Sequence, residues 1–318
     1  MIEDIVKYLG SDWNRYKEVF VESLSSRVPL LDSINRYLLE SLGKQLRPML
    51  CLLSAHICSG KVNDLTCSCA AASELLHTAT LLHDDVVDDS KIRRGRPTVG
   101  AMVSSTASVL VGDFWLSIAM KNIVDVGNMD IIREYRTCLE ELSKGELFQM
   151  EKSFYLDTTE EDYYKIISYK TASLFHAAML SGAYSVDASK EQIDAVGEYA
   201  IHLGLAFQIR DDILDYSPQM KTGKPSGQDI TEGKITLPLL GALRNQQQKS
   251  SRKLMADFKH GRRRRVLKTV TEAGGLKYAQ DALEEESRKA ISALSVFEDS
   301  QAKEFLTKLA LSLCNRNS

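Results

Sequence analysis

The 318-residue chain lacks the features that mark secreted and membrane-spanning proteins. Residues 1–10 carry acidic side chains and no basic stretch followed by an apolar one, so we expect no signal peptide. No uninterrupted apolar run reaches about 18 residues, the length that spans a bilayer. The longest candidate, Val109–Met120, is broken by Asp113. These absences predict a soluble, cytoplasmic protein.

Paired cysteines and an excess of positive charge are absent too. The six cysteines include no CxxC spacing and lie among apolar residues, so we interpret them as reduced structural thiols. The formal net charge is -3, which gives no global attraction to nucleic acid or to an anionic membrane. Any site for an anion must therefore be local.

Proline and strand-like alternation are scarce, whereas helical periodicity is abundant. The chain has only six prolines, and its apolar residues recur at the three- to four-residue spacing of amphipathic helices. This periodicity predicts, among others, helices over about residues 100–126, 131–155, 160–185 and 190–216, with a loop at residues 94–97. Thr158 and Thr159, followed by acidic residues, are the candidate caps of the helix over 160–185. The one clearly irregular stretch, residues 217–233, is too short and too rich in motifs to separate two domains. We therefore predict an all-α fold in which residues 1–318 form a single domain, although the length alone would suggest two.

Two aspartate-rich motifs lie at the ends of apolar helical stretches. Both have the spacing DDxxD, and their aspartates are Asp84, Asp85, Asp88, Asp211, Asp212 and Asp215. The first and last aspartates of each motif share one helix face, because residues i and i+4 are neighbours there. Carboxylates this close repel one another unless a cation lies between them, and hard oxygen ligands suit Mg²⁺. Either motif alone is compatible with a solvated helix end, but the repetition favours metal binding.

Basic residues cluster beside these motifs, although the chain is net negative. Lys44 and Arg47 lie at a predicted helix start, where backbone N–H groups also favour anions. Arg93 and Arg94 follow the first aspartate motif. Further lysines lie within a predicted helix and along the irregular stretch, namely Lys170, Lys221, Lys224 and Lys234. Taken as a set, these cations favour phosphate binding.

These residues resemble those of the trans-type (all-E) polyprenyl diphosphate synthases, in the long-chain, octaprenyl-like branch. The matching segments occur in order: GKQLRP (43–48), ELLHTATLLHDDVVDDSKIRRGRPT (74–98), VGD (111–113), GELFQME (145–151), KTA (170–172), GLAFQIRDDILDY (204–216) and GKPSGQDITEGKITLP (223–238). The resemblance implies a helical bundle of the isoprenoid synthase type, with a central cavity between two Asp-rich helices. It also implies a homodimer and a Mg²⁺-dependent condensation of isopentenyl diphosphate with an allylic diphosphate.

The resemblance further implies a role for each matching residue. The six aspartates would bind Mg²⁺, with three ions expected beside the diphosphate, and all of them except Asp215 count as catalytic. The allylic diphosphate would be held by Lys170, Lys224 and Lys234. Isopentenyl diphosphate would be held by Lys44, Arg47, His77, Arg93 and Arg94. Thr171 and Gln208 would lie near the reacting carbons and complete the catalytic set with Lys170.

Product length is predicted from two small residues before the first motif. Ala79 lies about 7.5 Å down the helix from Asp84. Bulky aromatics at Ala79 or Thr80 stop elongation early in the family, so their absence predicts a product of about 30 to 50 carbons. Such a product suggests transient membrane contact on release, for which the arginine run 262–265 offers a candidate surface if it is not simply solvated. The alternatives are a farnesyl- or geranylgeranyl-type synthase, a non-catalytic partner subunit of a synthase, and a terpene cyclase, which would not need Lys44 and Arg47.

Overall fold

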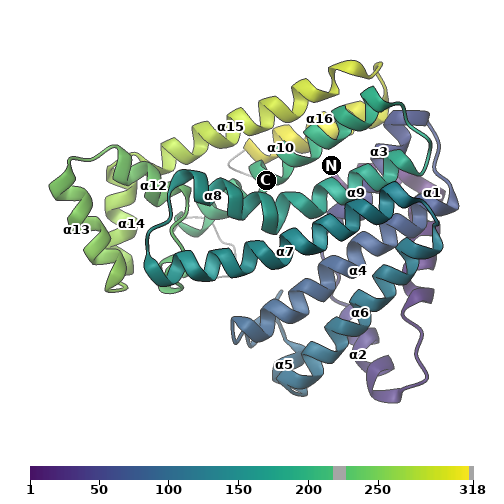
Figure 1. Ribbon diagram of the computed structural model, residues 1–318, viewed down its shortest axis with the longest axis horizontal. Coiled ribbons are helices and arrows are strands. Elements are labelled where there is room, and N and C mark those ends of the chain that lie inside the picture. The colour runs from purple at the N-terminus through teal and green to yellow at the C-terminus, as the bar shows by residue number, and fades with distance from the viewer. Residues whose placement is uncertain (218–226, 315–318) are drawn as a thin grey trace. The chain divides into compact units, whose positions relative to one another are not determined.

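The computed structural model describes residues 1–217 and 227–314, and nearly all of them are helical (Figure 1). The helices are α1 (Ile2–Ser23), α2 (Pro29–Leu39), α3 (Leu46–Ser59), α4 (Asp64–Val87), α5 (Val99–Met102), α6 (Ser105–Asp125), α7 (Met129–Tyr155), α8 (Glu160–Ile167), α9 (Ser173–Tyr184), α10 (Lys190–Asp215), α11 (Gln228–Thr231), α12 (Leu237–Arg244), α13 (Gln248–Lys259), α14 (Arg263–Glu272), α15 (Gly275–Ala293) and α16 (Gln301–Cys314). A π-helical segment, η1 (Ser168–Ala172), joins α8 to α9, and a short 3₁₀ turn, η2 (Leu294–Val296), follows α15. Two-residue strands β1 (Ile92–Arg93) and β2 (Arg96–Pro97) complete the described structure. The all-α prediction is confirmed.

The chain divides into two compact units. Unit 1 consists of residues 1–136, 177–197 and 296–305, and unit 2 consists of residues 137–176, 198–295 and 306–318. Helices α7, α9 and α10 each contribute residues to both units. That the whole chain behaves as one domain stays a prediction.

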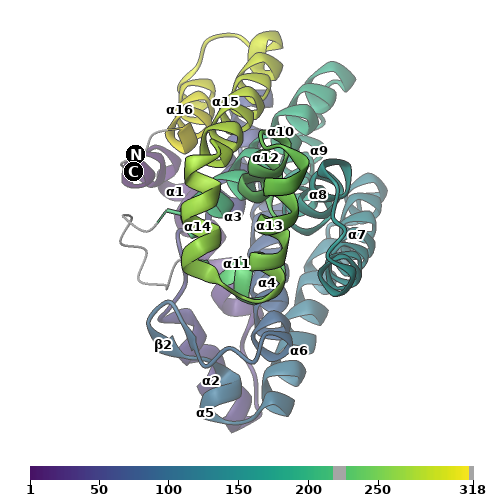
Figure 2. The ribbon, with the colours of Figure 1, turned by 90° about the vertical axis from the view of Figure 1, so that its left-hand side faces the viewer.

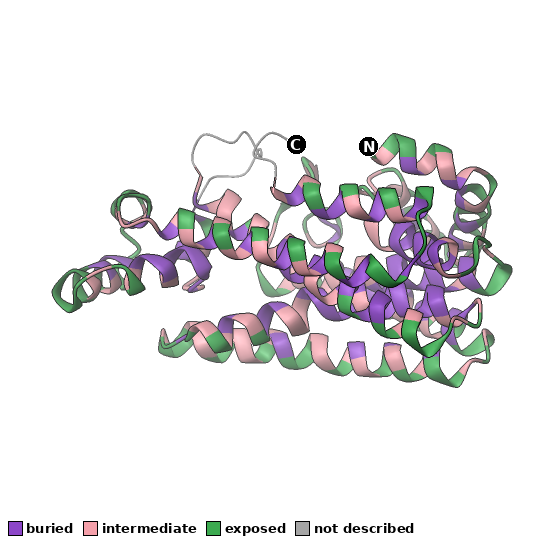
Figure 3. Ribbon diagram, turned by 90° about the horizontal axis from the view of Figure 1, so that it is seen from above, coloured by how far each residue is buried: buried purple, intermediate pink, exposed green. Residues whose placement is uncertain are grey.

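Unit 1 is built around α4, which packs against α1, α3 and α6. Residues 69–76 of α4 are buried on every side, with Cys69, Ala70 and Leu75 fully buried, because helices surround them. Trp115 of α6 lies in the same core, and its indole N–H donates to Asn35 Oδ1 at 2.9 Å. Most other helices bury one side and expose the other (Figure 3). Helix α4 thereby carries the first aspartate motif outward from a rigid core.

Helix α6 is long and apolar enough to cross a membrane by length and composition alone. In its most apolar window of 18 residues, 39% of the residues are buried. The helix contains Asp113 and Lys121, and it packs extensively against α4 within unit 1. A core helix of a soluble protein meets the same criteria.

Two elements differ from the sequence expectation in unit 1. The helix expected over residues 100–126 is split, because Ser104 caps α6 by accepting a hydrogen bond from Ala107 N–H. The loop expected over residues 94–97 belongs to the β1–β2 hairpin. Its turn residues Arg94 and Gly95 both have positive φ, as a type I′ turn requires.

Unit 2 contains the second half of α7, the η1 segment and the C-terminal half of α10. The helix expected over residues 160–185 begins as predicted, since Thr159 forms a capping box with Asp162. It is then interrupted by η1. The six cysteines are free thiols, and burial raises the pKa of Cys69 to about 12. This agrees with the interpretation of the cysteines as structural.

Candidate active site

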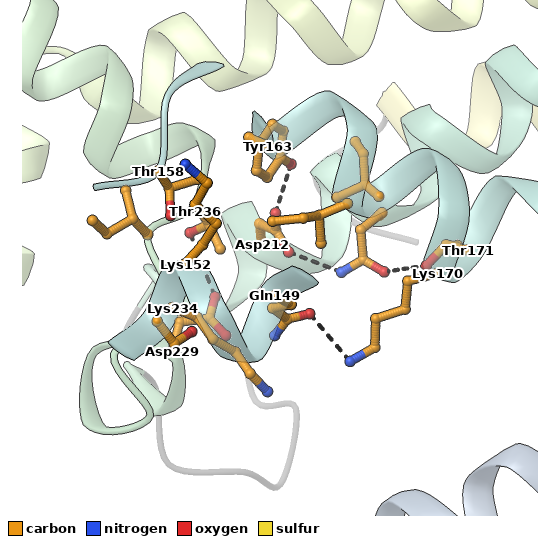
Figure 4. A pocket seen from close by; sticks show the side chains of 15 residues that line it. Gln149, Lys152, Thr158, Tyr163, Lys170, Thr171, Asp212, Asp229, Lys234 and Thr236 are labelled. Carbon is orange, nitrogen blue, oxygen red and sulfur yellow. Dashed lines mark hydrogen bonds between the residues drawn. The ribbon is translucent and has the colours of Figure 1, made fainter. Parts of the chain in front are cut away.

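A cavity of about 120 Å³ in unit 2 gathers polar side chains from four segments of the chain (Figure 4). Its polar lining comes from α7, α8 with η1, α10 and the segment around α11, namely Gln149, Lys152, Ser153, Thr158, Tyr163, Lys170, Thr171, Gln208, Asp212, Asp229, Lys234 and Thr236. Ile166, Ile167 and Ile235 form the apolar part of its wall. The cavity thus brings together Lys170, Thr171, Gln208, Asp212 and Lys234, all of which the sequence predicted as site residues.

A hydrogen-bonded chain fixes the back of this cavity. Thr171 Oγ1 donates to Gln208 Oε1 at 2.8 Å, and Gln208 Nε2 donates to Asp212 Oδ1 at 2.9 Å. The other carboxylate oxygen of Asp212 accepts from the Tyr163 hydroxyl at 2.6 Å. Because both ends of the Gln208 amide are satisfied, its orientation is set. These bonds hold Thr171 and Gln208 in one arrangement.

The π-helical segment explains how Lys170 and Thr171 reach the cavity. A π turn widens the helix by one residue, and such turns are frequent at functional sites. Two glycines allow neighbouring helices to approach η1 closely. A Cβ on Gly204 of α10 would lie 2.6 Å from Ala172 Cα, and one on Gly145 of α7 would lie 2.8 Å from Tyr169 Cβ. The GLAFQ and GELFQ segments therefore carry their glycines for packing against this turn.

Two carboxyl groups lie in the cavity wall, of which Asp212 is buried and Asp229 is half-buried. Burial raises the pKa of Asp212 to about 7, although hydrogen bonds from Tyr163 and Gln208 oppose the shift. Burial also raises the pKa of Asp229 well above its usual range, and the nearby Asp212 adds to the effect. Buried carboxylates cost free energy unless a cation accompanies them. A bound cation in this cavity would offset that cost.

The lysines of the cavity already lie beside carboxylates. Lys170 Nζ is 2.5 Å from Glu146 Oε2 and donates to Gln149 Oε1 at 3.2 Å. Lys234 Nζ is 2.5 Å from Glu232 Oε2. These partners restrain the lysines near the cavity, where they can act as point charges toward phosphate. Lys221 and Lys224 lie outside the described residues.

Asp215 has a different environment from the other aspartates of the second motif. Its carboxylate accepts from the backbone N–H groups of residues 227, 228 and 229 at 3.1, 3.0 and 3.2 Å. These bonds cap the start of α11. Asp215 therefore anchors the segment that delivers Asp229 and Lys234 to the cavity, while Asp211 is exposed on α10. That Asp215 also binds metal stays a prediction.

The predicted isopentenyl diphosphate residues gather within unit 1. Arg93 Nε donates to Asp85 Oδ1 at 2.7 Å, and Arg94 Nη1 donates to Ser41 O at 2.9 Å. Both arginines line a small cavity with Asp85. The guanidinium of Arg94 lies against Gly43, where a Cβ would be 2.5 Å from Nη2. Arg94 has a positive φ in the β1–β2 turn. Arg93 and Arg94 therefore lie side by side at one short turn.

His77 lies among these arginines. Desolvation lowers the pKa of His77 well below its usual range, and the charges of Arg47, Arg94 and Arg93 lower it further. Burial and the neighbouring arginines thus favour the neutral form of His77, so the positive charge around it comes from the arginines. Glu74, one turn earlier on α4, is 2% exposed, and burial raises its pKa against the opposing effect of Arg47 and Arg94. Lys44 is exposed.

Comparison with known proteins identifies the family. The polyprenyl synthetase family model matches residues 28–273. The chain belongs to this family. It is 38% identical to an all-trans-nonaprenyl-diphosphate synthase (geranyl-diphosphate specific) of Rhodobacter capsulatus, with 97% of each chain covered. It is 35% identical to an octaprenyl diphosphate synthase of Haemophilus influenzae, covering 99% of this chain and 97% of that one. A crystal structure of a polyprenyl synthase from Caulobacter crescentus, complexed with calcium and isoprenyl diphosphate, superposes with a TM-score of 0.91 at 32% identity, covering 100% of this chain and 98% of that one.

The aspartate motifs of this polyprenyl synthetase chain suit a cation. Helices α4 and α10 both end in carboxylates with no basic residue in the last turn. Negative side chains at a helix C-terminus are unfavourable, because they face the negative end of the helix dipole. Within residues 1–217 and 227–314, no three His, Cys, Asp or Glu side chains converge as a preformed metal centre. Mg²⁺ typically takes only one or two carboxylates and completes its shell with water and substrate phosphates, which fits this donor set.

Seven polar residues of the cavity were not among the predicted site residues, namely Gln149, Lys152, Ser153, Thr158, Tyr163, Asp229 and Thr236. Gln149 and Asp229 lie inside the family-matching segments GELFQME and GQDITEGK, so that resemblance could have indicated them. Tyr163 and Lys152 lie outside every quoted motif. Tyr163 occupies an ordinary apolar helix position, and only its long-range contact with Asp212 identifies it.

Proposed function

We propose that this chain is a long-chain polyprenyl diphosphate synthase, which joins isopentenyl diphosphate repeatedly to an allylic diphosphate. The observation that carries the proposal is the cavity of unit 2, where Lys170 and Lys234 lie beside the Thr171–Gln208–Asp212 chain. Family membership and the names of the nonaprenyl and octaprenyl relatives support the same reaction.

The cavity residues have complementary tasks in this reaction. Lys170 and Lys234 stabilise the charge that develops on the departing diphosphate as the allylic C–O bond breaks. Thr171 and Gln208, locked by their hydrogen bonds, present fixed dipoles toward the allylic cation. The double bond of isopentenyl diphosphate then forms the new C–C bond, and the released diphosphate accepts the proton whose loss forms the double bond of the new allylic diphosphate. Ile166 and Ile167 help exclude water from this cation.

Mg²⁺ is part of the proposal. The aspartates at the ends of α4 and α10 would hold it, and when bound it would neutralise diphosphate charge. The donor set supports a cation, and the Caulobacter polyprenyl synthase structure is a complex of that protein with calcium and isoprenyl diphosphate. Asp85 would bind Mg²⁺ while its carboxylate also accepts the hydrogen bond that orients Arg93. Arg47, Arg93 and Arg94 in turn offer guanidinium groups to isopentenyl diphosphate.

A long product is supported by the sizes of residues on α4. Ala79 is buried, and Thr80 is half-buried with its hydroxyl donating to His77 O. Neither side chain is large enough to close a hydrophobic tunnel. The relatives named for eight and nine prenyl units agree with this.

We also propose a homodimer. Helix α6 exposes Leu110, which is 63% exposed, together with Val109. In unit 2, α7 exposes an i, i+3, i+7 stripe of Leu147, Met150 and Phe154, the last 80% exposed. Apolar helix faces of this kind are typical of subunit interfaces. Light scattering should give a mass near twice 35.5 kDa, and Phe154→Glu should weaken the dimer. A monomeric native protein would contradict it.

The deciding experiment is incubation of the purified protein with Mg²⁺, farnesyl diphosphate and radiolabelled isopentenyl diphosphate. The dephosphorylated products are then separated by length. A ladder that ends at one long product supports the proposal. Products that stop at four prenyl units, one addition beyond the farnesyl primer, would make it a short-chain synthase. No incorporation, also with geranyl and geranylgeranyl primers, would indicate a partner subunit or a cyclase.

A further inference from the structure

The helical hairpin of α13 and α14 carries a large excess of positive charge. Residues 248–272, called the basic hairpin below, contain nine Lys and Arg but only two Asp and Glu. Their net charge of +7 leaves -10 on the rest of a chain whose total is -3. Figures 1 and 2 show the two helices side by side within unit 2. This one surface element therefore carries a local excess of positive charge on a chain that is otherwise net negative.

The fold of the hairpin depends on its apolar side. Leu254, Phe258, Val266 and Val270 are at most 2% exposed and belong to one apolar cluster. Every Lys and Arg of the hairpin other than Arg263 is exposed. Packing of the hairpin therefore depends on these four apolar side chains, whereas most of its Lys and Arg side chains are not needed to fill the core.

Some of the cations have structural partners. Arg262 Nη1 is 2.8 Å from Asp257 Oδ1, and Arg265 lies 3.9 Å from the same carboxylate. The hydrogen bond from Arg262 lowers the pKa of Asp257. Arg263 lies over Gly227, where a Cβ would be 2.7 Å from its Nε. Arg262 and Arg265 thus stabilise the turn between α13 and α14, and Arg263 packs on the residue that precedes α11.

Four other cations have no such role. Lys249, Arg252, Lys259 and Arg264 are exposed, and none of them forms an ion pair with another described residue. No large apolar side chain of the hairpin is exposed. A surface that is basic and not apolar attracts an anionic layer without inserting into it. It also attracts nucleic acid, although the chain elsewhere is strongly negative.

We propose that the basic hairpin docks the protein on an anionic lipid surface. The choice of partner rests on the proposed function, because a long polyprenyl chain is insoluble in water and its user must be reached through a bilayer. The hairpin provides electrostatic attraction alone, so docking is peripheral, reversible and sensitive to salt. Docking would keep the enzyme at the bilayer surface that its long product enters.

The test compares two variants that lose the same charge. The hairpin variant carries Lys249→Gln, Arg252→Gln, Lys259→Gln and Arg264→Gln. The control carries four exposed substitutions in unit 1, Lys7→Gln, Lys17→Gln, Arg27→Gln and Lys61→Gln. None of the eight residues forms an ion pair with another described residue, so neither variant should unfold. Circular dichroism melts check this.

Binding is measured by co-sedimentation with vesicles of phosphatidylcholine alone or with about one third phosphatidylglycerol, at about 0.1 M salt, where the Debye length is about 10 Å. The native protein should bind only the anionic vesicles, and less at higher salt. Each charge near an anionic surface strengthens binding about fivefold, so the loss of four charges should weaken binding of the hairpin variant by about two orders of magnitude or more. The control should change little.

Equal losses in both variants, or equal binding to both kinds of vesicle, would overturn the proposal. It is also wrong if the hairpin variant loses affinity for a duplex RNA while its vesicle binding is unchanged. Turnover of isopentenyl diphosphate is measured in parallel without vesicles. Active protein that ignores vesicles refutes docking alone, whereas inactive protein that binds them through the hairpin supports docking and refutes the proposed function.

Discussion

Replacing Gly204 with alanine tests whether the close approach of α10 to the π-helical segment is needed for catalysis. The added Cβ would lie 2.6 Å from Ala172 Cα and 2.8 Å from Ala172 Cβ. Carbon atoms prefer about 3.5–4.0 Å, so the helix and the segment must separate by about 1 Å. The neighbouring atoms belong to backbone and to a Cβ, so no flexible side chain can move aside. Thr171 and Gln208, which flank this contact, must move apart with them.

Two opposing effects determine the stability of Gly204→Ala. Overpacking costs about 1–3 kcal/mol, whereas replacing a helical glycine by alanine gains about 1 kcal/mol. The net loss should be about 0–2 kcal/mol, which a protein of this size survives. Catalysis should suffer more, because a misplacement of about 1 Å in a catalytic group can cost about 100-fold in rate. Turnover should therefore fall far more than the melting temperature.

Gly100→Ala is the matched control. Gly100 lies in α5, and its added Cβ would be 3.8 Å from the nearest atom, an ordinary contact. Product formation from farnesyl and isopentenyl diphosphates is measured for both variants, together with thermal melts. The reasoning is refuted if Gly204→Ala keeps native turnover, or if both glycine variants lose activity equally.

Three further substitutions give distinct outcomes. Tyr163→Phe leaves a buried oxygen of Asp212 without its donor, so it should cost about 1–3 kcal/mol and lower turnover; unchanged melts and rates would contradict this. In Glu286 burial raises the pKa, but hydrogen bonds led by that from His202 lower it overall. The stability it supplies is present above its unfolded value of 4.5 and lost as pH falls. Glu286→Gln should therefore melt lower at pH 7 and depend less on pH through the acid range, whereas parallel curves would refute the assignment. Ala79→Phe should shorten the product, and an unchanged ladder would show that Ala79 does not line the tunnel.

Much of the fold was predictable because helical periodicity is a local signal. The expected helix over residues 131–155 is α7, and the one over 190–216 is α10, each within two residues of its true ends. The cap at Thr159 was read from its hydroxyl and the acidic residues that follow it. Such signals need only neighbouring residues.

The site was predicted less completely because its geometry depends on distant contacts. The apolar pattern runs on through residues 160–185, so nothing local marks the π turn. That turn is visible only through the glycines of two other helices, Gly145 and Gly204, which meet its backbone. Likewise the DDxxD spacing gives no reason to distinguish one aspartate from another. In the structure, however, Asp215 accepts hydrogen bonds from backbone N–H groups 12 to 14 residues further along the chain.

Several of the positively charged groups of the candidate sites lie where regular helix geometry is interrupted. Lys170 and Thr171 lie in a π turn, and Arg94 has a positive φ in a hairpin turn. Gln45, next to Lys44, is also left-handed, and its side chain donates to the Tyr16 hydroxyl at 2.7 Å. Irregular backbone is less stable than helix, so it persists only where surrounding packing enforces it. The regular helices provide that packing, and the irregular turns position the charged side chains that the proposed reaction requires.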